Sequence, residues 1–295
     1  MKQAVGLIGV GNMGRIILRQ LVDAEYPVVA YDPSPASQKT IKESAAELVN
    51  SPRDVGLRAQ LTILSLPAPK NIHDVLWGDK GLFETLRQGA IVIDTSTVDP
   101  QITKKAYEAC LSRNGGYLDA PVLGRPASFG KWVLPVGGDE VLLKTVEPVL
   151  RTFAAKIVHV GTSGSGHTLK LLNQLMFSAI NAITAEMFAI ADKMGMPRKK
   201  IFDVIASSGA ATVSGLFMEC GKKIVDNDFT PIFPIDLLCK DAGLGIEMAD
   251  FAGAPPVISS TIQYYNRIAQ TQGIGDLDTS ALIQVFNRLY SREQG

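Results

Sequence analysis

The sequence has few cysteines, no excess charge of either sign and no long uninterrupted apolar run. Its three cysteines, Cys110, Cys220 and Cys239, are far apart and show no Cys-x-x-Cys or Cys/His spacing, so neither a disulfide framework nor a metal site is expected. With 29 Lys and Arg against 29 Asp and Glu, no net positive field attracts nucleic acid or anionic lipid. The apolar stretch after Lys2 is too short and glycine-rich for a secretory signal. We therefore expect a cytoplasmic protein with reduced thiols.

The chain is long enough for two domains, because its 295 residues exceed the commonest domain size about twofold. Short β-rich runs fill the first half: Ala4–Val10, Val28–Tyr31, Leu61–Leu66, Ile91–Thr95, Tyr117–Leu123, Trp132–Val136 and Ile157–Val160. Most of them are continuously apolar and do not alternate, which is typical of parallel strands covered by helices on both faces. The pattern predicts an α/β fold, with a doubly wound, Rossmann-type sheet over residues 1–161.

The strand pattern stops after Val160. A Gly/Ser turn cluster follows, and residues 166–195 then contain no Pro and are rich in Ala, Leu, Met and Glu, which predicts a helix about 45 Å long. Further helical stretches are expected at Arg198–Ser207, Val213–Val225, Ile235–Phe251 and Pro256–Gln270. We expect residues 162–295 to form an all-α domain for substrate binding and for assembly into a homodimer or homotetramer. Polar residues in the long helix argue against a membrane span.

A Gly-x-Gly-x-x-Gly motif at Gly9–Gly14 follows the first apolar run and opens a helical stretch. In a dinucleotide-binding turn, Gly9 makes the tight turn, Gly11 lets the backbone approach the pyrophosphate, and Gly14 allows close packing of the helix. The motif alone is weak evidence for a dinucleotide site, because a glycine-rich turn that binds no ligand has the same pattern.

Asp32 strengthens the dinucleotide interpretation. It ends the second apolar run, 18 residues after Gly14, close to the spacing expected of the acid that binds the adenosine ribose. A carboxylate there repels a 2′-phosphate and residues 33–35 include no Arg or Lys, which favours NAD over NADP. Lys39 and Lys42 are near enough to leave NADP open.

Further motifs extend along nearly the whole chain. They are residues 94–100 (DTSTVDP), 119–122 (DAPV) with 136–138 (VGG), 164–166 (GSG) with Lys170 and Asn173, and Phe233 with Lys240-Asp241. Together with the N-terminal motif they resemble the β-hydroxyacid dehydrogenase family of 3-hydroxyisobutyrate, tartronate semialdehyde and related reductases. The resemblance implies NAD(P)-dependent hydride transfer between a small acidic β-hydroxy compound and its semialdehyde, with a lysine giving or taking the hydroxyl proton.

The resemblance also implies roles for the matching residues. The catalytic candidates are Lys170 and Asn173. The substrate-binding candidates are Ser96, Leu123, Gly124, Arg125, Gln174 and Lys240. The cofactor-binding candidates are Gly9, Gly11, Asn12, Met13, Gly14, Asp32, Leu66, Pro67, Ser96 and Lys240.

Three of these residues have simpler alternative interpretations. Lys170 could be a solvated surface lysine, but a helix would place it on one face with Asn173, Gln174 and Phe177. Ser96 could cap the next helix. Lys240 could form a surface pair with Asp236, four residues earlier.

Two departures from the family pattern concern the substrate. Where many members have Ser-Gly-Gly, a turn that receives a carboxylate, this chain has Leu123-Gly124-Arg125. Arg125 could bind a carboxylate, sulfonate or phosphate bidentately, as in sulfolactaldehyde-type reductases, or could be ion-paired or point outward. The usual Asn-Asn is Asn173-Gln174 here. The substrate therefore stays open.

Three alternative functions remain open. An imine reductase resembles this architecture but generally lacks the lysine that Lys170 matches. A 6-phosphogluconate dehydrogenase would need a longer helical domain. A binding module that senses a dinucleotide without catalysis would show the same nucleotide motif, although the combination of Ser96, Lys170 and Lys240 favours an enzyme.

Overall fold

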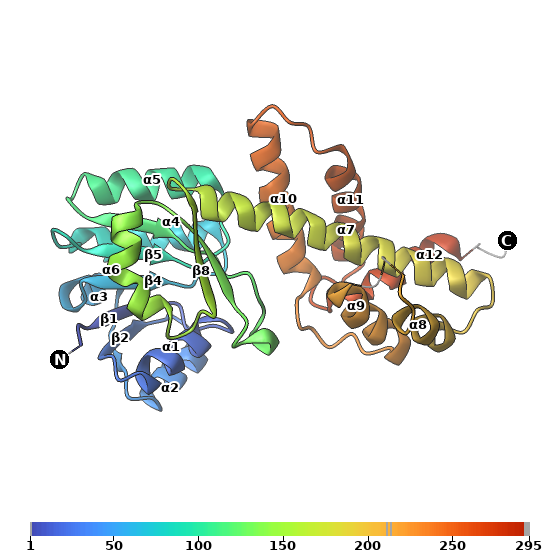
Figure 1. Ribbon diagram of the computed structural model, residues 1–295, viewed down its shortest axis with the longest axis horizontal. Coiled ribbons are helices and arrows are strands. Elements are labelled where there is room, and N and C mark those ends of the chain that lie inside the picture. Colours follow the sequence, from blue (N-terminus) through green and yellow to red (C-terminus); the bar gives the residue numbers. More distant parts are fainter. Residues whose placement is uncertain (1, 211, 213, 292–295) are drawn as a thin grey trace. The chain divides into compact units, whose positions relative to one another are not determined.

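The computed structural model describes residues 2–210, 212 and 214–291, and it consists of two compact units, Met1–Lys170 and Leu171–Gly295 (Figure 1). The division falls inside helix α7 (Ser165–Lys193). The domain boundary predicted at residue 161 precedes this helix and stays a prediction. Val213, at the start of one predicted helical stretch, lies outside the described residues.

A single sheet organises the first unit. Its strands are β1 (Val5–Ile8), β2 (Val28–Tyr31), β3 (Glu47–Leu48), β4 (Leu61–Leu64), β5 (Ile91–Asp94), β6 (Gly116–Asp119), β7 (Val133–Gly137) and β8 (Lys156–Gly161). Their order is β3-β2-β1-β4-β5-β6-β7-β8, and neighbours from β3 to β6 are parallel. β7 runs antiparallel to β6 and parallel to β8, so the parallel arrangement predicted for all the runs ends at β6.

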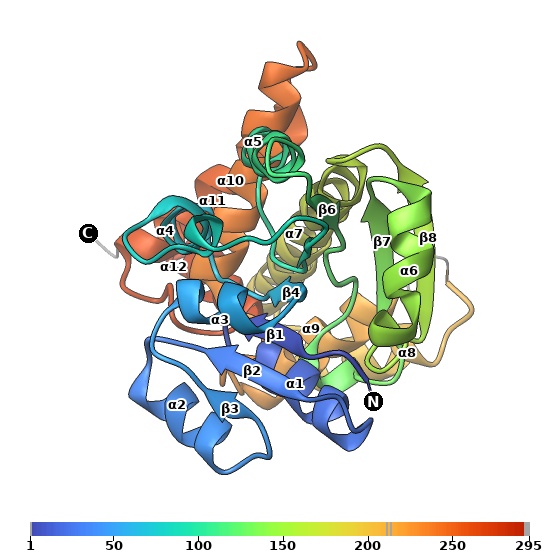
Figure 2. The same cartoon turned by 90° about the vertical axis from the view of Figure 1, so that its left-hand side faces the viewer.

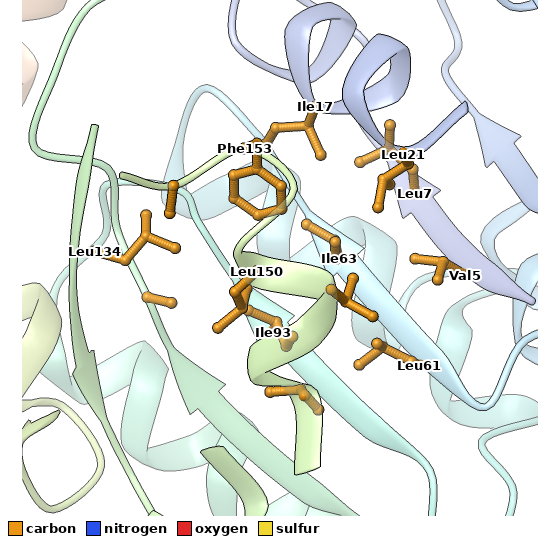
Figure 3. Packing of buried hydrophobic residues seen from close by; sticks show 14 of the residues in the cluster. Val5, Leu7, Ile17, Leu21, Leu61, Ile63, Ile93, Leu134, Leu150 and Phe153 are labelled. Atoms are coloured by element: carbon orange, nitrogen blue, oxygen red, sulfur yellow. The ribbon is translucent and has the colours of Figure 1, made fainter. Parts of the chain in front are cut away.

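Helices cover both faces of the sheet. They are α1 (Gly14–Asp23), α2 (Pro35–Lys42), α3 (Pro52–Arg58), α4 (Pro69–Trp77), α5 (Pro100–Leu111) and α6 (Glu140–Leu150). Successive strand side chains point to opposite faces, so Leu7 packs in the cluster under α1 and α6, while Ile8 packs under α3, α4 and α5. Figure 3 shows Ile17 of α1 and Leu150 of α6 in the first cluster. Figure 2 shows β1 between α1 and α3. The doubly wound sheet is confirmed.

Helices are the regular elements of the second unit, and no strand is assigned among its described residues. After α7 it contains α8 (Arg198–Ala206), α9 (Gly215–Asp226), α10 (Ile235–Phe251), α11 (Val257–Thr271) and α12 (Leu282–Tyr290). Phe188 of α7, Phe217 of α9 and Phe286 of α12 share its buried core. The predicted all-α character is confirmed, although α12 was not predicted.

Helix α7 is, within the described part of the chain, the one helix long and apolar enough to cross a membrane by length and composition. Half of its most apolar window is buried inside the protein, and Ala185 and Phe188 are fully buried in the helical core. Core helices of soluble proteins meet the same criterion, so this is weak evidence for a span.

Candidate dinucleotide and substrate site

The glycine loop between β1 and α1 has the packing that a dinucleotide site requires. Gly9 has φ +96°, and a Cβ there would lie 2.3 Å from the Ser65 carbonyl oxygen. A Cβ on Gly14 would lie 2.0 Å from the Gly9 carbonyl oxygen, whereas a Cβ on Gly11 would meet nothing within 4 Å. Gly9 and Gly14 are thus required by packing, and Gly11 leaves space beside the backbone. Because α1 has no side-chain N-cap, its positive N-terminal end suits a pyrophosphate.

The position of this loop in the sheet also suits a nucleotide. The chain passes from β1 to β2 on one side and later to β4 on the other, which makes the β1/β4 boundary a topological switch point. Leu66 and Pro67 come shortly after β4, and the Leu66 side chain lies beside Gly9. One of the predicted cofactor contacts, Leu66, therefore lies next to the glycine loop, and Pro67 follows it in the chain.

Asp32 follows β2 and is fixed to the glycine loop. Its Oδ2 accepts a hydrogen bond from the Val10 N–H (2.7 Å), and its Oδ1 accepts one from the Ser34 N–H (2.8 Å). Each carboxylate oxygen has two lone pairs, so both can still accept from ribose hydroxyls. The geometry is compatible with the predicted role.

Ser96 lies just beyond β5 and is held from two sides. Its Oγ accepts a hydrogen bond from the Leu66 N–H (2.9 Å), and its own N–H donates to Asp94 Oδ1 (2.9 Å). The Tyr117 hydroxyl donates to the other oxygen of this fully buried carboxylate (2.8 Å). Burial, and then the charge of Asp94, raise the pKa of Tyr117 well above its usual value, so this donor stays protonated. The buried network fixes Ser96 between the ends of β4 and β5.

The alternative role of Ser96 as a helix cap is wrong. The cap of α5 is Asp99, whose Oδ1 accepts from the N–H groups of Gln101 (2.9 Å) and Ile102 (3.0 Å). Since Ser96 Oγ already accepts from Leu66, its O–H can donate to a ligand.

Asp119, at the end of β6, fixes the start of α7. Its buried carboxylate accepts from the N–H groups of Gly164 (2.7 Å) and His167 (3.0 Å). A Cβ on Gly166 would lie 2.6 Å from the Asp119 carbonyl oxygen, so this glycine is needed for close approach. The first turn of α7 is thereby attached to the sheet one turn before Lys170.

Lys170 is buried, and its Nζ donates to the Val122 carbonyl oxygen (3.0 Å). The alternative of a solvated surface lysine is therefore wrong. Val122 immediately precedes the turn at residues 123–125. The structure brings the candidate proton donor to the segment that the sequence assigns to the substrate.

His167, on the first turn of α7, is fully buried. Its Nδ1 lies 2.7 Å from Thr103 Oγ1 of α5, and its Nε2 has no hydrogen-bond partner. The contact links α5 to α7 beside the Asp119 cap.

The substrate turn is the start of a hairpin. Leu123 and Val133 exchange two backbone hydrogen bonds (2.9 and 3.1 Å). The Arg125 N–H donates to Ser128 Oγ (2.8 Å), and Arg125 itself is half-buried. Several backbone donors of this turn are thus used inside the hairpin.

The second unit contains the remaining candidates in one polar cluster. Asn173 Nδ2 donates to Gln174 Oε1 (3.3 Å), and Gln174 Nε2 donates to Asp241 Oδ2 (2.6 Å). Lys240 Nζ lies 2.6 Å from Asp241 Oδ1. Asp236, the alternative partner of Lys240, accepts a hydrogen bond from Gln270 Nε2 through its Oδ1 (2.8 Å). Sequence reasoning missed the part of Asp241, although it stands in the Lys240-Asp241 pair of the motif.

Within the first unit, the carboxyl-terminal edge of the sheet thus gathers the glycine loop, Leu66 and Pro67, Ser96, the turn at 123–125 and Lys170. No group of three or more His, Cys, Asp or Glu among the described residues could hold a metal ion.

Two family profiles match the chain. The NAD binding domain of 6-phosphogluconate dehydrogenase matches residues 4–161, and the NAD-binding domain of NADP-dependent 3-hydroxyisobutyrate dehydrogenase matches residues 164–286. Together they cover most of the chain.

Curated relatives match along most of their length. A probable 3-hydroxyisobutyrate dehydrogenase of Dictyostelium discoideum is 28% identical, over 97% of this chain and 91% of its own. The 2-(hydroxymethyl)glutarate dehydrogenase of Eubacterium barkeri is 28% identical, over 97% and 95%. A probable 3-hydroxyisobutyrate dehydrogenase-like protein of Arabidopsis thaliana is 30% identical, over 97% and 85%.

Solved structures agree. The 3-hydroxyisobutyrate dehydrogenase of Salmonella typhimurium superposes with a TM-score of 0.87 at 27% identity, covering 97% of this chain and all of that one. An imine reductase of Myxococcus stipitatus gives 0.65 at 18% identity, covering 96% and 99%, which shows a shared fold alone. The chain belongs to the β-hydroxyacid dehydrogenase family and is an NAD(P)-dependent hydroxyacid/semialdehyde oxidoreductase.

Proposed function

We propose that the protein interconverts a small β-hydroxy acid and its semialdehyde, with Lys170 as the proton donor and acceptor. The observation that supports this most is the hydrogen bond from the buried Lys170 Nζ to the Val122 carbonyl oxygen, beside the turn that contains Arg125. An ammonium group held there can give its proton to a carbonyl oxygen during reduction.

The chemistry divides between the cofactor and the chain. A bound nicotinamide dinucleotide supplies the hydride in reduction and accepts it in oxidation. The loop Gly9–Gly14 would hold its pyrophosphate and Asp32 its adenosine ribose. Lys170 protonates the oxygen that becomes the hydroxyl, and the neutral amine takes this proton back in the reverse direction. Ser96 donates its O–H to the substrate, which orients the reacting carbonyl.

Arg125 is proposed as the receptor for the acidic group of the substrate. Leu123 has no side-chain donor, and its N–H is used by Val133. The N–H of Arg125 is used by Ser128 Oγ. The guanidinium supplies a charged, planar replacement that matches a carboxylate, sulfonate or phosphate.

The polar cluster of the second unit is proposed to support binding. Asp241 fixes both the Gln174 amide and the Lys240 ammonium. Asn173 would contact the substrate near Lys170, three residues away on the same helix. By their resemblance to the family pattern, Gln174 and Lys240 are proposed to bind the substrate, and Lys240 is also proposed to bind the cofactor.

NAD is proposed over NADP as the preferred cofactor, because Asp32 immediately follows β2 and residues 33–35 carry no cation. Of the two lysines that leave NADP open, Lys39 forms an exposed ion pair with Glu43. Comparing kcat/KM for NADH and NADPH tests the preference, and a higher value for NADPH contradicts it.

We also propose that the protein is a cytoplasmic homodimer or homotetramer. All three cysteines are free and buried, as in a reducing compartment. Met176, Ile183 and Ile190 recur every seven residues along α7 and are 65%, 60% and 47% exposed. Such a stripe suits helix packing against another copy.

Initial rates of NADH oxidation test the activity with succinic, methylmalonic and tartronic semialdehydes, glyoxylate and sulfolactaldehyde. We expect turnover of an acidic aldehyde that is lost in Lys170→Ala and kept in Lys193→Ala, a control lysine on the same helix. Lys170→Arg keeps the charge but holds its proton too firmly, so it is also expected to be inactive. Wild-type turnover in Lys170→Ala contradicts the mechanism. NADH binding without turnover of any of these aldehydes would favour the dinucleotide-sensing alternative.

A further inference from the structure

The turn proposed to bind the substrate's acidic group is closed by a tryptophan. The Leu123–Val133 pair is antiparallel, so the next positions inward, Gly124 and Trp132, stand opposite each other. The loop between them contains a short 3-10 helix, Pro126–Ser128. Trp132 immediately precedes β7 and is fully buried.

The indole of Trp132 lies against Gly124. A Cβ on Gly124 would be 2.4 Å from the indole Cδ1 and 3.1 Å from Nε1, and Gly124 has φ +157°. The ring therefore occupies the space where any side chain at residue 124 would stand. It also packs edge-on against Phe129, with ring centroids 5.4 Å apart.

The same indole reaches the next residue. Its Nε1–H donates to the Arg125 carbonyl oxygen (2.8 Å), which also accepts from Ser128 N (2.9 Å) and Ser128 Oγ (3.0 Å). A buried indole N–H without an acceptor is unfavourable, so this contact favours one position of the Arg125 carbonyl. The contact ties the Arg125 backbone to the start of β7.

We propose that Trp132 is a positioning residue that sets where the Arg125 guanidinium stands. This inference rests on the proposed role of Arg125 in binding the acidic group. The Lys170 Nζ bonds to the Val122 carbonyl, so one short segment positions both the proton donor and the anion receptor. Moving Arg125 while Val122 stays in place weakens binding of the acid and leaves proton transfer intact.

Trp132→Phe tests the proposal, because it keeps an aromatic ring and removes the N–H. For the acidic aldehyde that the enzyme turns over, we expect KM to rise about five- to tenfold, the equivalent of one neutral hydrogen bond, with kcat within twofold. NADH affinity should not change. Trp77→Phe is the matched control, since Trp77 is the other tryptophan of the chain and lies on α4.

A double variant separates positioning from a general loss of structure. In an Arg125→Ala background, Trp132→Phe should add no further rise in KM, because the group it positions is gone. Gly124→Ala, which displaces the indole, provides an independent variant with the same expected selective rise in KM.

Two results overturn the proposal in distinguishable ways. Suppose first that Arg125→Ala raises KM. Trp132 does not position Arg125 if Trp132→Phe raises KM no more than Trp77→Phe does. The same conclusion follows if Trp132→Phe raises KM by the same factor in the Arg125→Ala background as in the wild-type protein. If Arg125→Ala leaves KM unchanged, both the anion role of Arg125 and this inference fail.

Discussion

At the scale of single residues, the candidate site depends on carboxylates that accept hydrogen bonds from main-chain N–H groups. Asp32 holds the glycine loop, Asp94 holds Ser96, and Asp119 holds the first turn of α7. Asp94 and Asp119 are fully buried, where hydrogen bonds to a charged acceptor are strong. The three carboxylates therefore fix the backbone segments that carry the candidate site residues.

Replacing Asp119 with Asn tests this at one residue. The amide can accept only one of the two N–H groups and presents its own donor to the other, so we expect unfolding free energy to fall by about 1–3 kcal/mol. We also expect kcat to fall, because Lys170 lies one turn further along α7. Urea unfolding and initial rates measure the two effects.

Asp139→Asn is the matched control, because Asp139 caps α6 through the N–H groups of Val141 and Leu142 in an exposed position. This variant should lose some stability and keep its kcat. Equal kcat losses in the two variants would show that the α7 cap has no special part in placing Lys170.

The buried thiols predict how stability depends on pH. Burial raises the pKa of Cys110 and Cys220 from 9.0 to about 12. Above pH 9 the unfolded chain loses these protons while the folded chain keeps them, so unfolding free energy falls as pH rises. From pH 8 to pH 10 the two thiols should account for about 2–3 kcal/mol of this loss.

Urea unfolding at both pH values measures this loss. The Cys110→Ala/Cys220→Ala double variant should lose correspondingly less stability over the same interval. An identical loss in wild type and double variant would count against the thiols as its source.

At the scale of elements, the sequence predicted what local patterns determine. Continuous apolar runs marked seven strands, and the glycine spacing marked the turn into α1. β3 was missed because its two residues, Glu47 and Leu48, form no apolar run. The reversed direction of β7 was missed, because a continuous apolar run does not show whether a strand pairs in parallel or antiparallel with its neighbour. α12 had a usable signal, since Leu282, Ile283, Val285 and Phe286 are spaced for one helical face.

The strand–loop–helix element β1–α1 offers a test that separates packing from binding. A Cβ at Gly11 meets no protein atom, so Gly11→Ala should keep the melting temperature and weaken NADH binding. A Cβ at Gly14 meets the Gly9 carbonyl oxygen, so Gly14→Ala should lower the melting temperature as well. Thermal unfolding and NADH titration measure both, and a normal NADH affinity in Gly11→Ala would contradict the nucleotide site.

At the scale of the whole molecule, the sequence predicted a sheet domain followed by a helical domain, and both are confirmed. Long-range partners could not be predicted. Asp241 meets Gln174 across 67 positions, and Asp119 meets His167 across 48. Such contacts depend on how elements pack, which spacing along the chain does not record.

Self-association is the prediction that belongs to this scale. Ile183→Asp places a charge in the exposed apolar stripe of α7 and should lower the mass measured by light scattering. Val141→Asp, at an exposed position on α6, should leave it unchanged. A monomeric wild-type protein would contradict the proposed assembly.

The most direct test of the central claim follows the transferred hydrogen. NADH deuterated at C4, used in both stereochemical forms with the acidic aldehyde that is turned over, should deliver deuterium from one form to the new carbinol carbon, as seen by NMR. Lys170→Ala should bind this NADH and transfer none. Deuterium transfer at the wild-type rate in Lys170→Ala, or an alcohol product without deuterium from either form, would contradict the account.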